Sequence, residues 1–102
     1  MLKLRNLNNV IVLYTGSDTL IGTHVQTFQG TNTVFVFKNI LQIIKPDEEK
    51  LEIHLTIPAF VLATQKELYA FCCDEFLSME EPTDELIAAY NEIIEKRKKE
   101  SD

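Results

Sequence analysis

The sequence predicts a small, mainly β domain that ends in one α-helix. Residues 9–44 form three apolar runs rich in Val, Ile, Thr and Phe, and short polar breaks separate them, as is typical of consecutive antiparallel strands. Residues 51–57 alternate strictly between apolar and polar side chains, which indicates a half-buried strand. Residues 83–97 instead carry apolar side chains at helical spacing.

Length and charge restrict the class of protein. The 102 residues fit a single domain, 1–102, with one core. The apolar runs are too short to span a bilayer and the N-terminus lacks the apolar core of a signal peptide, so we expect a cytoplasmic protein. Residues 1–45 carry about +3 and the remainder about −9, for a net charge of −6. This balance argues against broad, non-specific binding to nucleic acid.

The first half predicts a three-stranded meander. The expected strands are about 9–15, 19–28 and 33–44, and the breaks between them are rich in Gly, Ser and Asn. Gly22 interrupts the second strand, and an isolated Gly there indicates a sharp bend or a bulge. The third strand is apolar on both faces, so we expect the sheet to bury one face and another element to cover the other.

The second half continues the sheet and then changes to a helix. After a turn at 46–49, residues 51–57 predict a strand that points Leu51, Ile53, Leu55 and Ile57 inward. We interpret 59–67 as mostly loop and predict strands at about 67–73 and 75–80. Pro82 and Thr83 indicate a helix start. The apolar stripe of this helix comprises Leu86, Ile87, Tyr90, Ile93 and Ile94.

The sequence offers no catalytic or metal-binding constellation. His24 and His54 fall on different predicted strands, without carboxylates or cysteines at ligand spacing, which favours surface or interface roles. The adjacent pair Cys72–Cys73 lacks metal-site spacing, and we interpret both as buried, reduced thiols in a strand. The Phe28, Phe35 and Phe37 cluster could stack bases, but the scarcity of positive charge favours core packing. We therefore expect no enzyme activity, no cofactor and no metal.

Two segments resemble the motifs of the Sm-like (LSm/Hfq-like) family. The first motif, an apolar strand, a Gly turn, a strand with an internal Gly and a further apolar strand, is carried by Val10–Tyr14, Gly16, Leu20–Gly22, Phe28–Gln29 and Val34–Phe37. The second is echoed by Ala70–Leu77. As a whole the chain is similar to Sm-like proteins of cyanophage origin. The resemblance implies a small, strongly bent five-stranded Sm-like (SH3-like) barrel over about 9–80, with the helix at 83–97 as a C-terminal addition.

The resemblance also implies a ring and an RNA site. In the family, the fourth and fifth strands pair between subunits, and we place this oligomer interface at Tyr69, Phe71, Phe76 and Leu77. The positions that correspond to the RNA-contacting loops are Gln29, Asn32, Thr33, Cys72 and Asp74. Here Gln29 replaces an acidic residue, and Cys72–Cys73 replace the family's Arg-Gly. Because that guanidinium is missing, the oligouridine-binding activity of the family does not carry over.

Three hypotheses follow from the sequence. The first is a non-enzymatic, ring-forming Sm-like protein, phage-derived, that acts as an assembly or macromolecule-binding scaffold. The second is an Sm-like regulator of the RNA-chaperone type that binds RNA through altered loops. The third is a structural component of a phage virion. The helix stripe is expected to dock on its own barrel or on a neighbouring subunit, with partner binding as the alternative.

Overall fold

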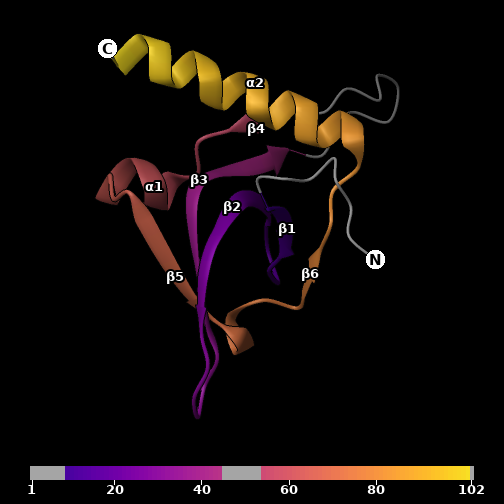
Figure 1. The fold of residues 1–102 in the computed structure, drawn as a ribbon, viewed down its shortest axis with the longest axis vertical. Coiled ribbons are helices and arrows are strands. Elements are labelled where there is room, and N and C mark those ends of the chain that lie inside the picture. The colour runs from indigo at the N-terminus through magenta and orange to yellow at the C-terminus, as the bar shows by residue number, and fades with distance from the viewer. Residues whose placement is uncertain (1–8, 45–53, 102) are drawn as a thin grey trace.

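The computed structural model of the chain describes residues 9–44 and 54–101. These residues form a mainly β domain with a long C-terminal helix (Figure 1). The strands are β1 (Val10–Tyr14), β2 (Thr19–Phe28), β3 (Val34–Ile44), β4 (His54–Thr56), β5 (Leu68–Cys72) and β6 (Ser78–Glu80). The helices are α1 (Ala59–Thr64), the short 3-10 helix η2 (Cys73–Glu75) and α2 (Asp84–Ser101).

The strands form one antiparallel, unclosed sheet. Its order is β4-β3-β2-β1-β6, and β5 also pairs with β3. The long strand β3 therefore has β2 along one side and two short partners along the other. Lys38 and the residues before it pair with β5, whereas Gln42–Ile44 pair with β4. Among the described residues, no pairing joins β5 to β6, so these two strands end the sheet on opposite sides.

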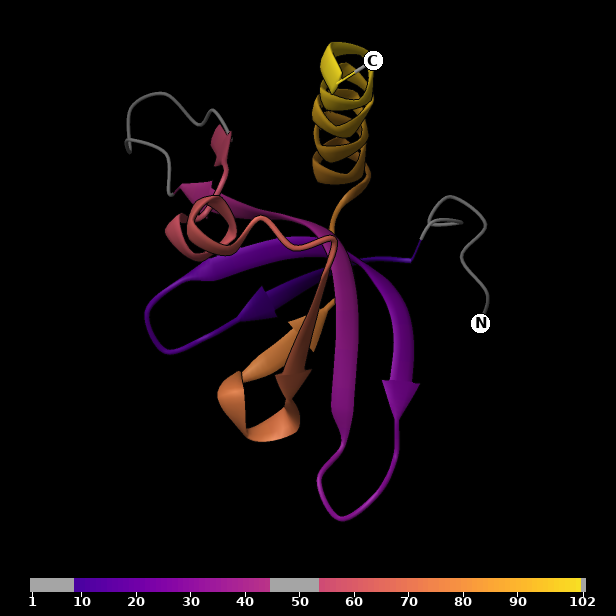
Figure 2. The same ribbon diagram turned by 90° about the vertical axis from the view of Figure 1, so that its left-hand side faces the viewer.

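The bend predicted at Gly22 is confirmed. The register of β2 against β3 shifts between Ile21 and Thr23 and again between His24 and Gln26. A Cβ atom at Gly22 would lie 3.2 Å from Cγ1 of Ile40 and 3.4 Å from the carbonyl oxygen of Lys38. The two strands therefore approach each other here more closely than most residues with a Cβ atom would allow. Figure 2 shows β2 and β3 curving beneath α2 as a result.

Helix α2 covers the outer face of the curved sheet, as the apolar stripe predicts. Thr83 caps the helix, since its Oγ1 accepts a hydrogen bond of 3.3 Å from the backbone N–H of Leu86. Glu92 and Lys96 form an i,i+4 ion pair at 3.7 Å on the exposed side of α2. We call the buried cluster beneath α2 the helix-side core, and its members are Val10, Val12, Ile21, Leu41, Leu86, Ile87, Tyr90 and Ile94.

The inner face of the sheet encloses a second cluster, which we call the inner core. Its buried members are Leu13, Leu20, Phe37 and Ile40. They alternate along the strands with members of the helix-side core, because successive side chains of a strand point to opposite faces. The expectation that the third strand is covered on both faces is therefore confirmed, since β3 contributes Phe37 and Ile40 to the inner core and Leu41 to the helix-side core. Half-buried aromatic side chains surround the inner core, among them Phe35, Tyr69, Phe71 and Phe76.

The structure corrects four local predictions. Phe28, which was expected to pack in the core with Phe35 and Phe37, is 53% exposed at the end of β2. Residues 59–64, interpreted as loop, form α1, which begins after Pro58 and ends where Gln65 turns into the left-handed region. The strand expected at 75–80 spans only Ser78–Glu80, because η2 occupies 73–75. Cys72 is half-buried and Cys73 is exposed, so the pair is not two buried strand thiols. The strand predicted at 51–57 is seen as β4, and its first three residues lie outside the described residues.

Candidate functional site

The candidate functional site is the pair of strand edges that end the sheet. Strand β5 pairs with β3 over five residues, from Val34 opposite Cys72 to Lys38 opposite Leu68. Strand β6 pairs with β1 over three residues, from Val12 opposite Glu80 to Tyr14 opposite Ser78. In the part of the chain that the structure describes, neither strand has a second strand partner. Such edges present backbone N–H and C=O groups that another strand can pair with.

Exposed apolar side chains lie beside both edges. On β5, Leu68 is 48% exposed and Ala70 is also exposed, whereas the alternate residue Tyr69 points toward the chain's own core. Next to β6, Leu77 is 80% exposed, although its backbone N–H is held at 2.6 Å by the carbonyl oxygen of Tyr14. A single exposed leucine is ordinary on a protein surface, so Leu77 is of interest because it adjoins the edge of β6.

The four predicted interface residues divide into two kinds. Tyr69, Phe71 and Phe76 are half-buried against the inner core. Phe71 lies 6.1 Å from Phe37, and Phe76 lies 5.6 Å from Phe35, between ring centroids. Leu77 alone is largely exposed. The interface role of all four stays a prediction, but the aromatic side chains face inward.

Sequence reasoning missed the exposed residues at the β5 edge. These are Leu68 and Ala70 on β5, with Phe60 and Leu62 on the preceding helix α1. The missed signal lies in the alternation of residues 68–72. Once Tyr69 and Phe71 are assigned to the core, Leu68 and Ala70 must face outward.

The two segments that the sequence resemblance matches to RNA-contacting loops of the Sm-like family lie next to each other. Gln29 and Asn32 are exposed in the β2–β3 turn, and Thr33 is half-buried where the turn enters β3. The backbone N–H of Cys73 donates a hydrogen bond of 2.9 Å to the carbonyl oxygen of Thr33. This bond joins the turn to η2, where Asp74 is exposed. The juxtaposition lies at the end of the sheet far from α2.

Negative charge dominates this end of the molecule at η2. Asp74 and Glu75 are adjacent and exposed, and Oε1 of Glu75 accepts a hydrogen bond of 2.8 Å from the N–H of Cys72. Partial burial, together with the carboxylates of Glu75 and Asp74, raises the pKa of the Cys72 thiol. The thiol is therefore protonated at neutral pH, which disfavours nucleophilic or metal-binding chemistry.

The two histidines do not form a catalytic pair. Nε2 of His24 lies 2.7 Å from Oγ1 of Thr27, and the ring lies 5.4 Å from Phe37 and 6.2 Å from Phe35 between centroids. His54 is exposed on β4, a different strand. A search of the described residues finds no group of three or more His, Cys, Asp or Glu side chains that could hold a metal ion. None of the described helices combines the length and apolar character needed to cross a membrane.

The buried hydroxyl of Tyr90 has a structural role. It lies 2.9 Å from Oγ1 of Thr23 and donates a hydrogen bond of 2.7 Å to the carbonyl oxygen of Asn39. Asn39 adopts a φ of 54° beside the Gly22 bend, so Tyr90 fixes the strained corner of β3 to α2. Burial raises the pKa of Tyr90 to about 12, so the hydroxyl stays protonated at neutral pH.

Comparisons with known proteins give no family assignment. No protein-family model matches the chain, and no curated protein matches it. The two sheet edges, with their exposed leucines, are therefore the features from which a function has to be argued.

Proposed function

We propose that this chain is a non-enzymatic, Sm-like protein whose copies join edge to edge into a closed ring. In this arrangement β5 of one copy pairs with β6 of the next, and the ring serves as a scaffold for another macromolecule. The observation that carries the proposal is the presence, among the described residues, of two strand edges without a further strand partner at opposite ends of one curved sheet. A repeated heterologous contact that closes on itself pairs every such edge.

The topology supports the family interpretation. Apart from the short strand β4, the sheet runs in the order β6-β1-β2-β3-β5, so the strands that correspond to the family's fourth and fifth lie at its two ends. The 3-10 helix η2 is the main element between them. The bend at Gly22 and the shifted register of β2 supply the strong curvature that a small barrel needs.

The directions of the two edge strands favour antiparallel pairing. Figure 1 shows β5 running away from α2, whereas β6 runs toward α2 and leads into it. If neighbouring copies stand side by side with their α2 helices at the same end, β5 of one copy is antiparallel to β6 of the next. Every strand pair described within the chain is also antiparallel.

The contact has a modest energy for each junction. Each backbone hydrogen bond contributes about 0.5–1.5 kcal/mol net, and β6 is only three residues long. Burial of an exposed leucine adds roughly 1.5–3 kcal/mol, and both Leu68 and Leu77 are available. Association also costs at least about 4 kcal/mol in lost freedom. A closed ring is therefore favoured over an open dimer, because only closure leaves no edge unpaired.

Native mass spectrometry and sedimentation velocity test this proposal. The wild-type chain should form one discrete closed oligomer at micromolar concentration. Leu77→Asp should shift it toward monomer, because a carboxylate would be buried in the junction without a partner. Val25→Asp is the matched control, since Val25 is exposed on β2 and lies on neither β5 nor β6. A wild-type chain that stays monomeric would overturn the proposal.

A second function, RNA binding, has one supporting observation. A backbone hydrogen bond between Cys73 and Thr33 joins the segment of Gln29, Asn32 and Thr33 to that of Cys73 and Asp74, the two segments that the resemblance matches to RNA-contacting loops. The carboxylates of Asp74 and Glu75 oppose binding of phosphate at this place. An electrophoretic shift of oligouridine or oligoadenine that weakens with salt would support the second function. The lack of any shift at micromolar protein would exclude it.

A further inference from the structure

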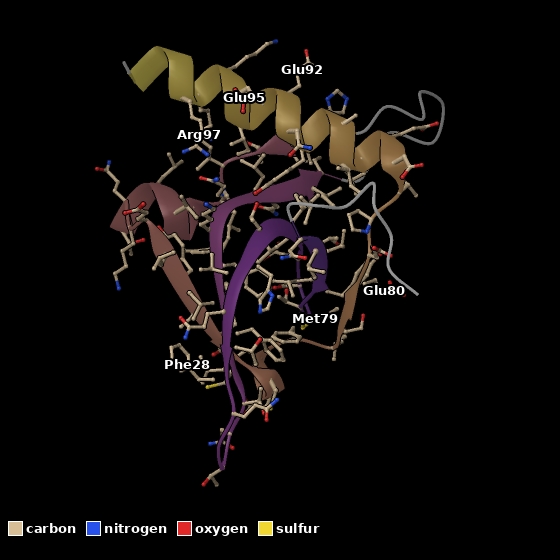
Figure 3. The ribbon with its side chains drawn as sticks, in the orientation of Figure 1. Phe28, Met79, Glu80, Glu92, Glu95 and Arg97 are labelled. Atoms are coloured by element: carbon tan, nitrogen blue, oxygen red, sulfur yellow. The ribbon has the colours of Figure 1, made fainter. Side chains whose placement is uncertain are left out.

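A polar hollow lies between one flank of α2 and the corner at which β2 and β3 bend. Its volume of about 560 Å³ is within the range of small-molecule sites, and the buried residues Tyr90 and Ile94 form its base. Its walls carry three polar side chains from the strands and three from the helix, namely Thr23, Lys38, Asn39, Asn91, Glu95 and Lys98. Figure 3 shows Glu95 on the part of α2 that passes over the sheet. Because the walls are polar, the hollow suits a polar ligand.

Hydrogen bonds within the chain fix the base of the hollow. The hydroxyl of Tyr90 lies 2.9 Å from Oγ1 of Thr23 and donates a hydrogen bond of 2.7 Å to the carbonyl oxygen of Asn39. It also lies 3.5 Å from the carbonyl oxygen of Lys38. These contacts hold the corner that carries Lys38 and Asn39 against α2. A site whose backbone is already in place loses less entropy when a ligand binds.

Several hydrogen-bonding groups of the lining are not used by the chain itself. Asn39 and Asn91 are half-buried, and among the described residues neither side-chain amide has a hydrogen-bond partner. The ammonium group of Lys38 likewise has no ion-pair partner in the part of the chain that the structure describes. Each amide offers two N–H donors and one acceptor oxygen, and the ammonium group offers three donors. These groups are therefore available to a ligand that carries several oxygen atoms.

The charge of the hollow is positive although the chain as a whole carries −6. Lys38 and Lys98 line it against the single carboxylate of Glu95. Burial raises the pKa of Tyr90 to about 12, but the positive charge of the half-buried Arg97 acts in the opposite direction, so a third cation lies near the base. Ammonium groups bind phosphate and carboxylate oxygens, and a carboxylate accepts hydrogen bonds from hydroxyl groups. The lining thus matches a ligand with one anionic group and several hydroxyl groups.

We propose that the polar hollow binds a small sugar derivative that carries one phosphate or carboxylate group. Lys38 binds the anionic group, and the charge of Lys98 assists it. The hydroxyl groups of the sugar form hydrogen bonds with Asn39, Asn91 and Glu95. This site goes beyond the ring of the proposed function, because its lining includes no residue of β5 or β6. It is also separate from the segments at η2, which lie at the end of the sheet far from α2.

Titration of the isotope-labelled full chain, followed by NMR, tests the site directly. Glucose 6-phosphate and gluconate should each bind saturably, whereas glucose or inorganic phosphate alone should bind about tenfold more weakly or less. The side-chain amides of Asn39 and Asn91 should shift, and that of Asn32 in the β2–β3 turn should not. The inference is wrong if neither charged sugar binds at millimolar concentration, if inorganic phosphate binds as tightly as glucose 6-phosphate, or if the shifts are spread over the whole surface.

Two pairs of variants with equal charge changes locate the site. Lys38→Glu should weaken the binding of glucose 6-phosphate by about tenfold or more, because it removes a charged hydrogen bond to the anionic group. Lys66→Glu is the matched control, since Lys66 is exposed and does not line the hollow. Asn91→Asp, compared with Asn32→Asp, repeats the test with a substitution that keeps the shape of the side chain. If each variant binds as well as its control, the inference is overturned, whatever the oligomeric state of the chain.

Discussion

The two cores of this small domain differ in how completely the chain itself encloses them. The helix-side core is closed by α2, and its eight members are all buried. The inner core has four buried members, and half-buried aromatic side chains from β3, β5 and the η2–β6 connection surround it. Beyond them lie Leu68 and Leu77, both exposed. Helix α2 covers the helix-side core, whereas the inner core is bordered by half-buried side chains at the β5 and β6 edges.

This contrast indicates which parts of the molecule respond to association. Contacts beneath α2 are intramolecular, so their contribution to stability does not depend on protein concentration. Contacts around the inner core lie next to the proposed junction, so association should add to them. Mutations in the two cores should therefore differ in whether their effect on stability depends on protein concentration.

The largest loss of stability is expected for Tyr90→Ala. Tyr90 is 1% exposed, and its loss leaves a cavity in the helix-side core and removes its hydrogen bonds to β2 and β3. We expect the free energy of unfolding to fall by about 3–5 kcal/mol. Chemical denaturation should give the same loss at low and high protein concentration. A loss that depends strongly on concentration would contradict the comparison of the two cores.

An intermediate loss is expected for Phe71→Ala in the inner core. Phe71 is half-buried and packs against Phe37 and Phe60, so less burial is lost than at Tyr90. We expect a loss of about 2–3 kcal/mol for the dilute monomer. At higher concentration the variant should also assemble more weakly, because Phe71 positions the β5 edge. If Phe71→Ala assembles at the same protein concentration as the wild type, the inner core does not contribute to the junction between copies.

Alkaline pH should weaken the helix-side core through Tyr90. Its pKa is raised from 10.0 to about 12 in the folded chain, so the unfolded state loses this proton first. The contribution is fully present below pH 10 and is lost as the pH rises from about 10 to 12, on the order of 2 kcal/mol in total. Denaturation midpoints of wild type and Tyr90→Phe should converge over this range. Parallel pH profiles would contradict the assignment.

A smaller loss is expected where β2 bends. In Gly22→Ala the new methyl group would meet Cγ1 of Ile40 at 3.2 Å, so the Ile40 side chain has to give way by a few tenths of an ångström. We expect a loss of about 1–3 kcal/mol, measured by thermal denaturation. Gly16→Ala is the control, because nothing lies within 4 Å of the position that its Cβ would occupy. If Gly22→Ala and Gly16→Ala destabilise the chain equally, the close approach at Gly22 is not the reason for the bend.

The smallest loss is expected at the helix cap. Thr83→Ala removes the hydroxyl that accepts a hydrogen bond from Leu86, which should cost about 1 kcal/mol. Thr83→Ser should retain most of that stability because it keeps the hydroxyl. A denaturation series that ranks serine with alanine would show that Oγ1 does not cap α2.

The sequence predicts the central strands and the final helix well because their patterns are strong and local. The alternation of residues 10–13 between two faces and the stripe from Leu86 to Ile94 each correspond to a buried cluster. Gly22 is predictive because a glycine within a strand has few other uses. These features depend on the spacing of apolar residues and on the position of glycine, both of which can be read from the sequence.

The edges are harder to predict because they depend on contacts that are distant in sequence. Tyr69 and Phe71 are as apolar as an interface residue should be, yet pairing of β5 with β3 points them inward. Residues 59–64 lack strong helix signals, and the packing of Val61 and the Thr64–Tyr69 hydrogen bond hold α1 in place. The neighbourhood of Thr33 and Cys73 likewise arises only from the fold. Comparison with a family motif can suggest that Thr33 and Cys73 lie close together, but the spacing of apolar residues cannot.

Hydrogen exchange at several protein concentrations tests the central claim most directly. If β5 and β6 of different copies pair, amide protection in residues 68–72 and 78–80 should rise with concentration, while protection in α2 stays constant. Leu77→Asp should abolish that rise, and Val25→Asp should preserve it. The account is contradicted if protection of β5 and β6 is the same at every concentration.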